Sequence, residues 1–248
     1  MFFCKKSEIL IAKFMILFLC SLMSDNAFSG EPFIGHVGHE SIVIPLPLAS
    51  KRASEGAPDY ESAKAHMPSG AHLIAVMYDY VPTSGGNKTP KKRVRFQYKI
   101  SAPDMMETVY FSEADFESLK KTIKASVEKK WGESDNYHRQ LQSQIDAAGK
   151  KLAPSDKRYA VKLSLGSITK NGVFADNPHF IGTYTVRNLK FEDGKEPQEQ
   201  QAFSGGGYLL IKGKLVFVDV AGDVDATESD IGLSRLAKWA EDILQSNP

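Results

Sequence analysis

Two segments of this chain have the hydrophobic pattern of β-strands. In residues 93–100 apolar and polar side chains alternate, which is typical of a strand with one buried and one exposed face. The apolar positions on its predicted buried side are Val94, Phe96, Tyr98 and Ile100. Residues 73–81 are almost wholly apolar, which is typical of a strand that is covered on both faces.

Two other segments have apolar residues three or four positions apart, as on the buried stripe of an amphipathic helix. The first begins after Ser112, which forms a variant capping box with Asp115, and the second begins at Thr227 with Asp230 in the same role. The stripes consist of Phe116, Leu119, Ile123, Val127 and Trp131 in the first segment and of Leu233, Leu236, Trp239, Ala240, Ile243 and Leu244 in the second. A more polar helix is expected over residues 135–150.

The second half of the chain is predicted to be rich in β-structure. Residues 180–191 favour a long strand, and residues 208–220 favour a hairpin that turns at Lys212 to Lys214. Asn171-Gly172 is a further turn signal. Because these strands follow one another without regular helical crossovers, the sequence predicts an α+β fold, with a largely antiparallel sheet and helices packed on one face.

We expect a single globular domain over residues 30–248. Within it, residues 49–70 are rich in Ala, Ser, Gly, Pro and charged residues, which predicts a long surface loop. Residues 41–48 contain Pro45 and Pro47, which a central strand does not tolerate. This segment is therefore predicted to be an edge strand or an extended packing arm.

Residues 1–29 have the pattern of a cleaved signal peptide. Lysines precede the apolar stretch 14–23, and Ala27 and Ser29 are the small residues that a signal peptidase requires. The apolar stretch is too short for a permanent membrane anchor. We therefore expect an exported protein, periplasmic or secreted, with no integral membrane span in the mature chain.

Removal of the signal peptide changes the charge and the cysteine content. The full chain has 31 basic residues, 30 acidic residues and 2 cysteines. Both cysteines, Cys4 and Cys20, and the basic excess lie in residues 1–29, so the remaining domain is neutral and free of cysteine. This excludes a disulfide framework, a Cys-ligated metal site and a Cys nucleophile. The absence of net charge also argues against binding to nucleic acid.

Two segments carry a family resemblance. Residues 207–244 (GYLLIKGKLVFVDVAGDVDATESDIGLSRLAKWAEDIL) combine a Gly-Lys hairpin, an acidic turn and a Trp-bearing helix, and residues 38–47 place an Ile/Leu-Pro motif just after the signal. In these features, over roughly a third of its length, the chain resembles a group of uncharacterised exported bacterial (periplasmic) proteins. The resemblance implies a protein of the bacterial envelope, and it transfers no catalytic residue.

Four of the six histidines are candidate ligands of a divalent metal ion: His36, His39, His66 and His72. Neutral imidazole is the commonest transition-metal ligand, and glycines around the first two would let the backbone wrap an ion. However, the odd separation of His36 and His39 would place them on opposite faces of a strand. An accidental surface pair explains them equally well, and no other cofactor is expected.

Asp79 and a run of glycines are further candidates. A carboxylate buried in the apolar segment around Asp79 would have a raised pKa, as a general acid does. Because no partner group is identifiable, we favour a hydrogen-bonded or solvated position at the strand end. Ser204 to Gly207 lead into a strand, whereas a phosphate-binding loop leads into a helix, so a flexible turn or bulge is predicted.

The chain has one dense basic cluster, which consists of Lys88, Lys91, Lys92, Arg93 and Arg95. It is a candidate contact surface for an anion or a partner, although a solvated face is the default interpretation. Because no catalytic constellation is found, the sequence favours a non-enzymatic binding or interaction protein, whose partner is an unknown envelope protein or small ligand. The binding surface would be the sheet face or this basic loop. The alternative is a metal-binding protein or metal-assisted hydrolase that uses the four histidines.

Overall fold

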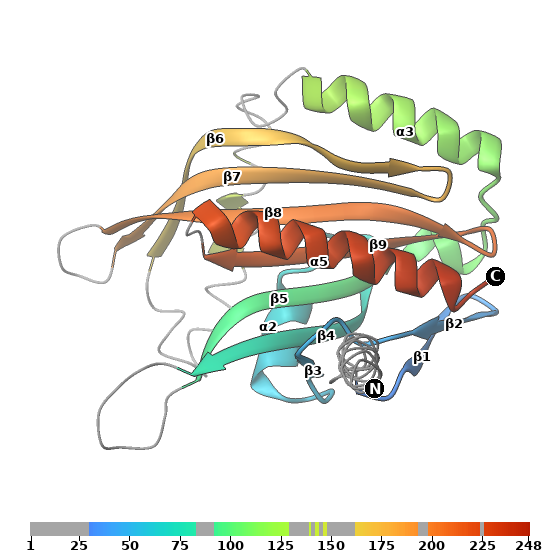
Figure 1. Cartoon of the computed structure of the whole chain (residues 1–248), viewed down its shortest axis with the longest axis horizontal. Helices are drawn as coiled ribbons and strands as arrows, with labels where there is room; N and C mark the ends of the chain where they lie inside the picture. The colour runs from blue at the N-terminus through green and yellow to red at the C-terminus, as the bar shows by residue number, and fades with distance from the viewer. Residues whose placement is uncertain are drawn as a thin grey trace, which may run out of the picture.

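A computed structural model describes most of the predicted domain. The described residues are 30–82, 92–128, 139, 142–143, 146–147, 162–192, 198–223 and 226–248. The predicted signal peptide and most of the predicted helix 135–150 lie outside them. The described residues form an α+β domain, in which helices pack on a seven-stranded antiparallel sheet (Figure 1). The predicted fold class is therefore confirmed.

The main sheet has the strand order β3-β4-β5-β9-β8-β7-β6, and every neighbouring pair is antiparallel. Its strands are β3 (Ser50–Arg52), β4 (Ala71–Pro82), β5 (Lys92–Pro103), β6 (Lys162–Asn177), β7 (Phe180–Glu192), β8 (Gln198–Ile211) and β9 (Lys214–Asp223). A separate hairpin pairs β1 (Phe33–Val37) with β2 (Glu40–Ile44). The helices are α2 (Pro58–Ala65), the 3-10 helix η1 (Asp104–Glu107), α3 (Glu113–Glu128) and α5 (Ala226–Gln245).

Helices α5 and α2 cover opposite faces of the sheet. Successive side chains of a strand point to opposite faces. In β4, Met77 belongs to the main core beneath α5, whereas Val76 and Tyr78 pack against Tyr60 and Ala63 of α2. Figure 1 shows α5 in front of the sheet and α2 behind it. Strand β4 is thus buried on both faces, as its apolar run predicts, but the helices are not confined to one face.

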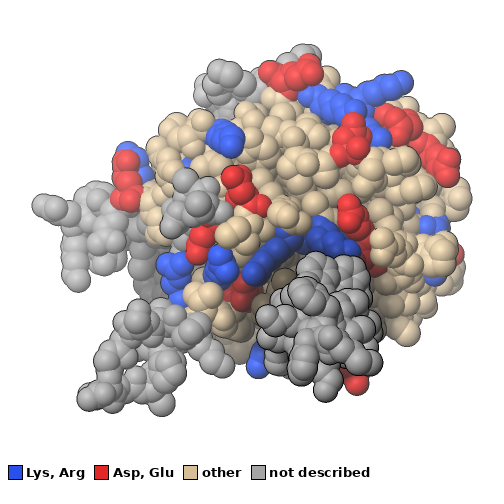
Figure 2. Space-filling view, viewed as in Figure 1, with Lys and Arg blue, Asp and Glu red and all other residues tan. Residues whose placement is uncertain are grey.

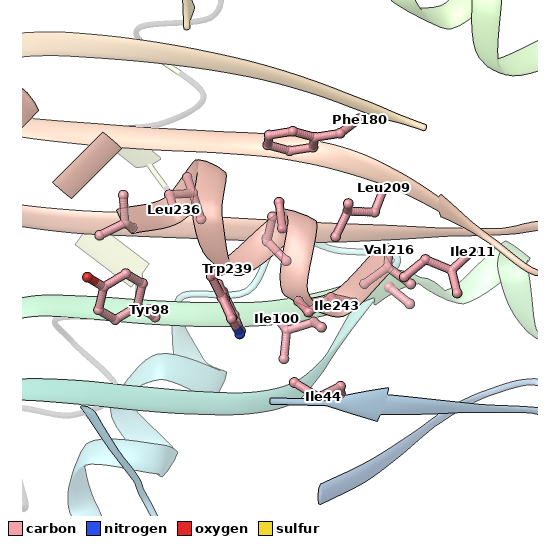
Figure 3. Packing of buried hydrophobic residues seen from close by; sticks show 14 of the residues in the cluster. Ile44, Tyr98, Ile100, Phe180, Leu209, Ile211, Val216, Leu236, Trp239 and Ile243 are labelled. Atoms are coloured by element: carbon pink, nitrogen blue, oxygen red, sulfur yellow. The ribbon is translucent and has the colours of Figure 1, made fainter. Parts of the chain in front are cut away.

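Helix α5 supplies the centre of the main core. Trp239 is 2% exposed, and its ring meets the ring of Tyr98 edge-on at 5.9 Å. Leu236 and Ile243 are fully buried one turn to either side, and Figure 3 shows these side chains between the helix and the strands. Burial of each such side chain stabilises the fold by about 1.5–3 kcal/mol. The predicted apolar face of the C-terminal helix is confirmed.

The glycine run lies in the middle of β8, where it pairs in regular register with β7 and β9. The prediction of a flexible turn or bulge is therefore wrong. A Cβ on Gly205 would clash with the side chain of Leu233 in α5, and a Cβ on Gly207 would clash with the carbonyl oxygen of Ile181 in β7. The glycines are needed for close packing of the helix and the neighbouring strand, not for flexibility.

The N-terminal hairpin is held by the C-terminal end of the chain. The Trp239 indole donates a hydrogen bond of 2.7 Å to the carbonyl of Pro45. The Asn247 amide donates to the carbonyl of Val43 at 2.7 Å and accepts from its N–H at 2.9 Å. The segment predicted as an edge strand or packing arm thus forms β2 beside the C-terminal end of α5, and Pro45 then lies next to Trp239 within the helix.

Helix α3 is fixed at its start and along its side. The predicted capping box is present, because Ser112 Oγ accepts from the N–H of Asp115 and Asp115 Oδ2 accepts from the N–H of Ser112, both at 3.1 Å. The buried Lys120 donates to the carbonyl of Asn177 at 2.8 Å and pairs with Asp176 at 2.9 Å. Lys124 forms a second ion pair with Asp176. These contacts attach α3 to the turn between β6 and β7.

Two local expectations are wrong. Residues 49–70 are not a long surface loop, because they contain β3, which pairs with β4, and α2, whose Tyr60 is only 8% exposed. This segment has few apolar residues, but those few cover the second face of β4. Asn171-Gly172 does not form a turn either. Both residues lie inside β6 and pair with residues of β7, and the chain reverses only after Asn177.

Replacement of Gly207 by Ala should destabilise the protein by about 1–3 kcal/mol, because the added Cβ meets backbone atoms that cannot move aside. Gly205→Ala is the matched control, since the only close overlap of its Cβ is with the end of the Leu233 side chain, which can move. Urea unfolding should show the larger loss for Gly207→Ala. Equal losses in the two variants would contradict this account of the glycine run.

The carboxylate of Asp176 should stabilise the fold only above acidic pH. The ammonium groups of Lys124 and Lys120 hold the pKa of Asp176 below its usual value. This stabilisation is therefore present above the unfolded-state pKa of about 3.9, and it is lost as the pH falls through the folded-state pKa. We expect Asp176→Asn to lose about 0.5–1 kcal/mol at pH 7, as is typical of partly exposed pairs.

Thermal unfolding from pH 7 down to pH 2 tests this prediction. The difference between Asp176→Asn and the parent protein should shrink towards zero below about pH 4. Asp242→Asn, which removes an exposed i,i+4 pair with Lys238, is the control and should have a smaller effect. A difference that persists unchanged at pH 2 would show that the ion pairs are not its cause.

Candidate functional site

Asp79 forms an ion pair with Arg235 of α5, a helix that lies far from it in the sequence. Its side chain lies on the α5 side of β4 and is 4% exposed. Arg235 Nη1 of α5 donates a hydrogen bond of 2.8 Å to Asp79 Oδ2. Asp79 is therefore a buried counter-ion. Of the two environments that we favoured, hydrogen-bonded or solvated, the structure shows the hydrogen-bonded one. The pairing gives no support to a general acid at this position.

Two arginines of the predicted basic cluster meet the same helix. Arg95 Nε lies 3.4 Å from Glu228 Oε1, and Arg93 Nη2 lies 3.8 Å from Glu228 Oε2. Lys88, Lys91 and the side chain of Lys92 lie outside the described residues. The described part of the basic cluster is thus turned towards the start of α5.

We call Arg93, Arg95 and Arg235, together with Asp79, Tyr98 and Glu228, the arginine cluster. Two of its guanidinium groups lie close to the same aromatic ring. The guanidinium carbon of Arg95 is 5.0 Å and that of Arg235 is 5.6 Å from the ring centroid of Phe96, which is within cation–π range. The cluster therefore combines residues that the sequence separates widely, in β4, in β5 and in α5.

Tyr98 is the most deeply buried residue of the arginine cluster. Its ring is fully buried against Trp239, and in Figure 3 its hydroxyl points away from Trp239 and from the other labelled apolar residues. Burial raises the pKa of Tyr98 to about 12, although the guanidinium of Arg235 nearby opposes the shift. The hydroxyl therefore stays protonated at physiological pH and can donate a hydrogen bond.

Two donors of the arginine cluster are buried without a hydrogen bond. Among the described residues, neither the Tyr98 hydroxyl nor Arg95 Nε has a partner of acceptable geometry. The contact from Arg95 to Glu228 is thus an ion pair without a hydrogen bond. Buried polar groups are almost always satisfied, so two orphaned donors beside a third cation are typical of a place where water or an anion binds.

The four histidines of the metal hypothesis do not form a site. His36 Nδ1 contacts Ser41 Oγ at 3.3 Å, and His66 Nδ1 donates to the carbonyl of Ser62 at 2.7 Å. His39 is exposed in the turn of the N-terminal hairpin. No group of three His, Cys, Asp or Glu side chains among the described residues is arranged to hold a metal ion.

His72 lies instead between two carboxylates. Its Nδ1 is 3.1 Å from Asp104 Oδ1, and its Nε2 is 3.4 Å from Glu107 Oε1. The other carboxylate oxygen of Glu107 accepts a hydrogen bond from the N–H of Gly38 at 2.8 Å. This arrangement ties η1 to β4 and to the N-terminal hairpin, which is a structural role.

Sequence reasoning missed a second charged pair, Lys99 with Asp219. The two side chains extend from β5 and β9 on the face opposite α5, with Lys99 Nζ 3.4 Å from Asp219 Oδ1. Burial raises the pKa of Asp219, while Lys99 opposes the shift. Residues 215–220 (LVFVDV) contain a signal, since Asp219 is the one charged residue in this apolar run. Both groups satisfy each other, so this pair is a weaker candidate than the arginine cluster.

The two buried groups of the arginine cluster should respond oppositely to truncation. Asp79→Ala leaves the guanidinium of Arg235 without its buried counter-ion and should cost about 3–5 kcal/mol. Tyr98→Phe removes a hydroxyl that lacks a hydrogen bond, so its unfolding free energy should stay unchanged or rise. Urea denaturation measures both, and a loss above about 1 kcal/mol for Tyr98→Phe would show that the hydroxyl has a partner.

No protein-family model and no curated protein sequence matches this chain.

Proposed function

We propose that this protein is an exported, non-enzymatic binding protein of the bacterial envelope, and that the arginine cluster binds a small anionic ligand. Support for export comes from the signal-like pattern of residues 1–29 and from the resemblance of residues 38–47 and 207–244 to exported bacterial proteins. Within the described part of the chain, none of the helices is long and apolar enough to cross a membrane.

The observation that carries the proposal is the excess of donors over acceptors in the arginine cluster. Arg95 Nε and the Tyr98 hydroxyl are buried without hydrogen bonds among the described residues. Arg235 uses Nη1 for Asp79, and a guanidinium has five N–H donors. A carboxylate or phosphate group offers several acceptor oxygens in the geometry that guanidinium groups prefer. Such a ligand would satisfy donors that the protein itself leaves unmatched.

The surroundings favour a small ligand over an extended polyanion. The side chains of Arg95 and Arg235 are each only 22% exposed, so little of either is open to an extended polyanion on the surface. Figure 2 shows basic and acidic residues interspersed over the visible face of the molecule. A long polyanion laid across this face would meet carboxylates as well as cations, which lowers its affinity.

The metal-binding alternative receives no support from the geometry. Three of the four histidines, His36, His66 and His72, contact Ser41, Ser62, and the pair Asp104 and Glu107, respectively, and do not converge on one position. The groups of the arginine cluster are donors and counter-ions, and they do not pair a nucleophile with a base. We therefore assign a binding function and no catalytic step.

The test is anion-dependent stabilisation. A ligand that binds only the folded state raises the unfolding temperature. Inorganic phosphate and acetate should raise it above the value in sodium chloride of equal ionic strength, and Arg95→Gln should lose most of this increment. Tyr98→Phe should keep its stability in chloride but respond less to phosphate. If neither anion has an effect beyond chloride, the proposal is wrong.

Lys238→Gln is the matched control for Arg95→Gln. Lys238 lies on α5, one turn beyond Arg235, is 65% exposed and pairs with Asp242. The substitution Lys238→Gln removes the same unit of positive charge from the protein as Arg95→Gln but leaves the arginine cluster unchanged. An equal loss of the phosphate effect in Lys238→Gln would indicate a non-specific response to net charge.

A further inference from the structure

We propose that Glu228 is an internal competitor for the ligand: its carboxylate occupies the charge-neutralising position of the arginine cluster and is displaced when an oxyanion binds. This inference rests on the proposed function and deepens it, because it says which side chain gives way when the carboxylate or phosphate group of the ligand binds. It also assigns a role to Glu228 that differs from that of Asp79, the other carboxylate of the cluster.

The two carboxylates of the arginine cluster are held very differently. Asp79 is 4% exposed and accepts a hydrogen bond of 2.8 Å from Arg235. Glu228 has a side chain that is 20% exposed, and its oxygens lie 3.4 Å from Arg95 Nε and 3.8 Å from Arg93 Nη2. Charge-assisted hydrogen bonds normally measure about 2.7–2.9 Å. Glu228 therefore neutralises the two arginines by proximity, without the hydrogen bonds that would fix it in place.

The unmatched donor lies directly under Glu228. Arg95 Nε is buried and is not hydrogen-bonded among the described residues, although Glu228 Oε1 lies 3.4 Å from it. The carboxylate of Glu228 is tethered to α5, so it contacts the guanidinium without hydrogen-bond geometry. A free oxyanion has no tether and can orient its oxygens along the N–H directions. This difference lets an external group replace Glu228 in spite of the ion pairs that would be lost.

The position of Glu228 on α5 lowers the free-energy cost of moving its carboxylate away from the arginines. It lies in the first turn of the helix, where the helix dipole favours a negative charge whether that charge belongs to a side chain or to a ligand. Two ion pairs are lost, one with Arg93 and one with Arg95. The side chain of Arg93 is 51% exposed, and solvent screens such a pair strongly. Arg95 is only 22% exposed, but the ligand would replace Glu228 as its anion. The bound ligand would thus recover the electrostatic stabilisation that Glu228 gives up.

The inference predicts that neutralising Glu228 improves binding. Glu228→Gln removes the competing charge and keeps the size of the side chain. Its dissociation constant for inorganic phosphate, measured by titration calorimetry on the purified protein, should fall about tenfold. Glu241→Gln is the matched control, because Glu241 is an exposed acid of the same helix beyond Trp239. It makes the same change in net charge and should leave the constant nearly unchanged.

The outcomes separate this inference from the proposed function. The competitor role and the proposed function are both supported if Glu228→Gln binds phosphate more tightly, Arg95→Gln binds it more weakly and Glu241→Gln binds it as the parent protein does. Unchanged or weaker binding in Glu228→Gln, with binding still lost in Arg95→Gln, overturns the competitor role and leaves the anion site intact. Absence of binding in the parent protein and in Glu228→Gln overturns both. Parallel titration with acetate shows whether the site takes carboxylates as well as phosphate.

Discussion

The close approach of α5 to the sheet is the constraint on which the rest of the structure depends. At position 205 of β8 a glycine allows this approach, because a Cβ there would displace the end of the Leu233 side chain. The approach places Trp239 against Tyr98 and within hydrogen-bonding distance of Pro45. A helix held further from the strands would lose core contacts and also the attachment of the N-terminal hairpin. The distance between α5 and the sheet thus affects the core as well as the contacts of both ends of the described chain.

The same helix determines which charges meet at the arginine cluster. Glu228 and Arg235 are seven residues apart, which is close to two helical turns, so both project towards the sheet. Arg235 reaches the buried Asp79 of β4, and Glu228 reaches the arginines of β5. Burial of Asp79 without Arg235 would be costly, because desolvation of an unpaired carboxylate destabilises the fold. Helix packing and charge pairing therefore support the same register of α5 on the sheet.

The sequence was informative where periodicity alone decides the structure. The alternation before Ile100, the apolar run around Met77 and the stripe through Trp239 all correspond to the elements that they predicted. It was misleading where tertiary contacts decide. The glycine run has the composition of a turn, but its glycines make room for neighbours, and the segment 49–70 has too few apolar residues to predict α2. The partner of Asp79 lies 156 residues away, and no local pattern indicates it.

The contrast between Asp79 and Glu228 would allow one cluster to be stable and also to bind the proposed oxyanion. Asp79 engages one nitrogen of Arg235 and holds that guanidinium in place, which leaves other N–H donors of the group unused by this contact. Glu228 balances the charge of Arg93 and Arg95 without hydrogen bonds. A fully hydrogen-bonded network would be more stable but would leave no donor for a ligand. Unsatisfied donors cost folding free energy, and a bound oxyanion would recover that cost as affinity.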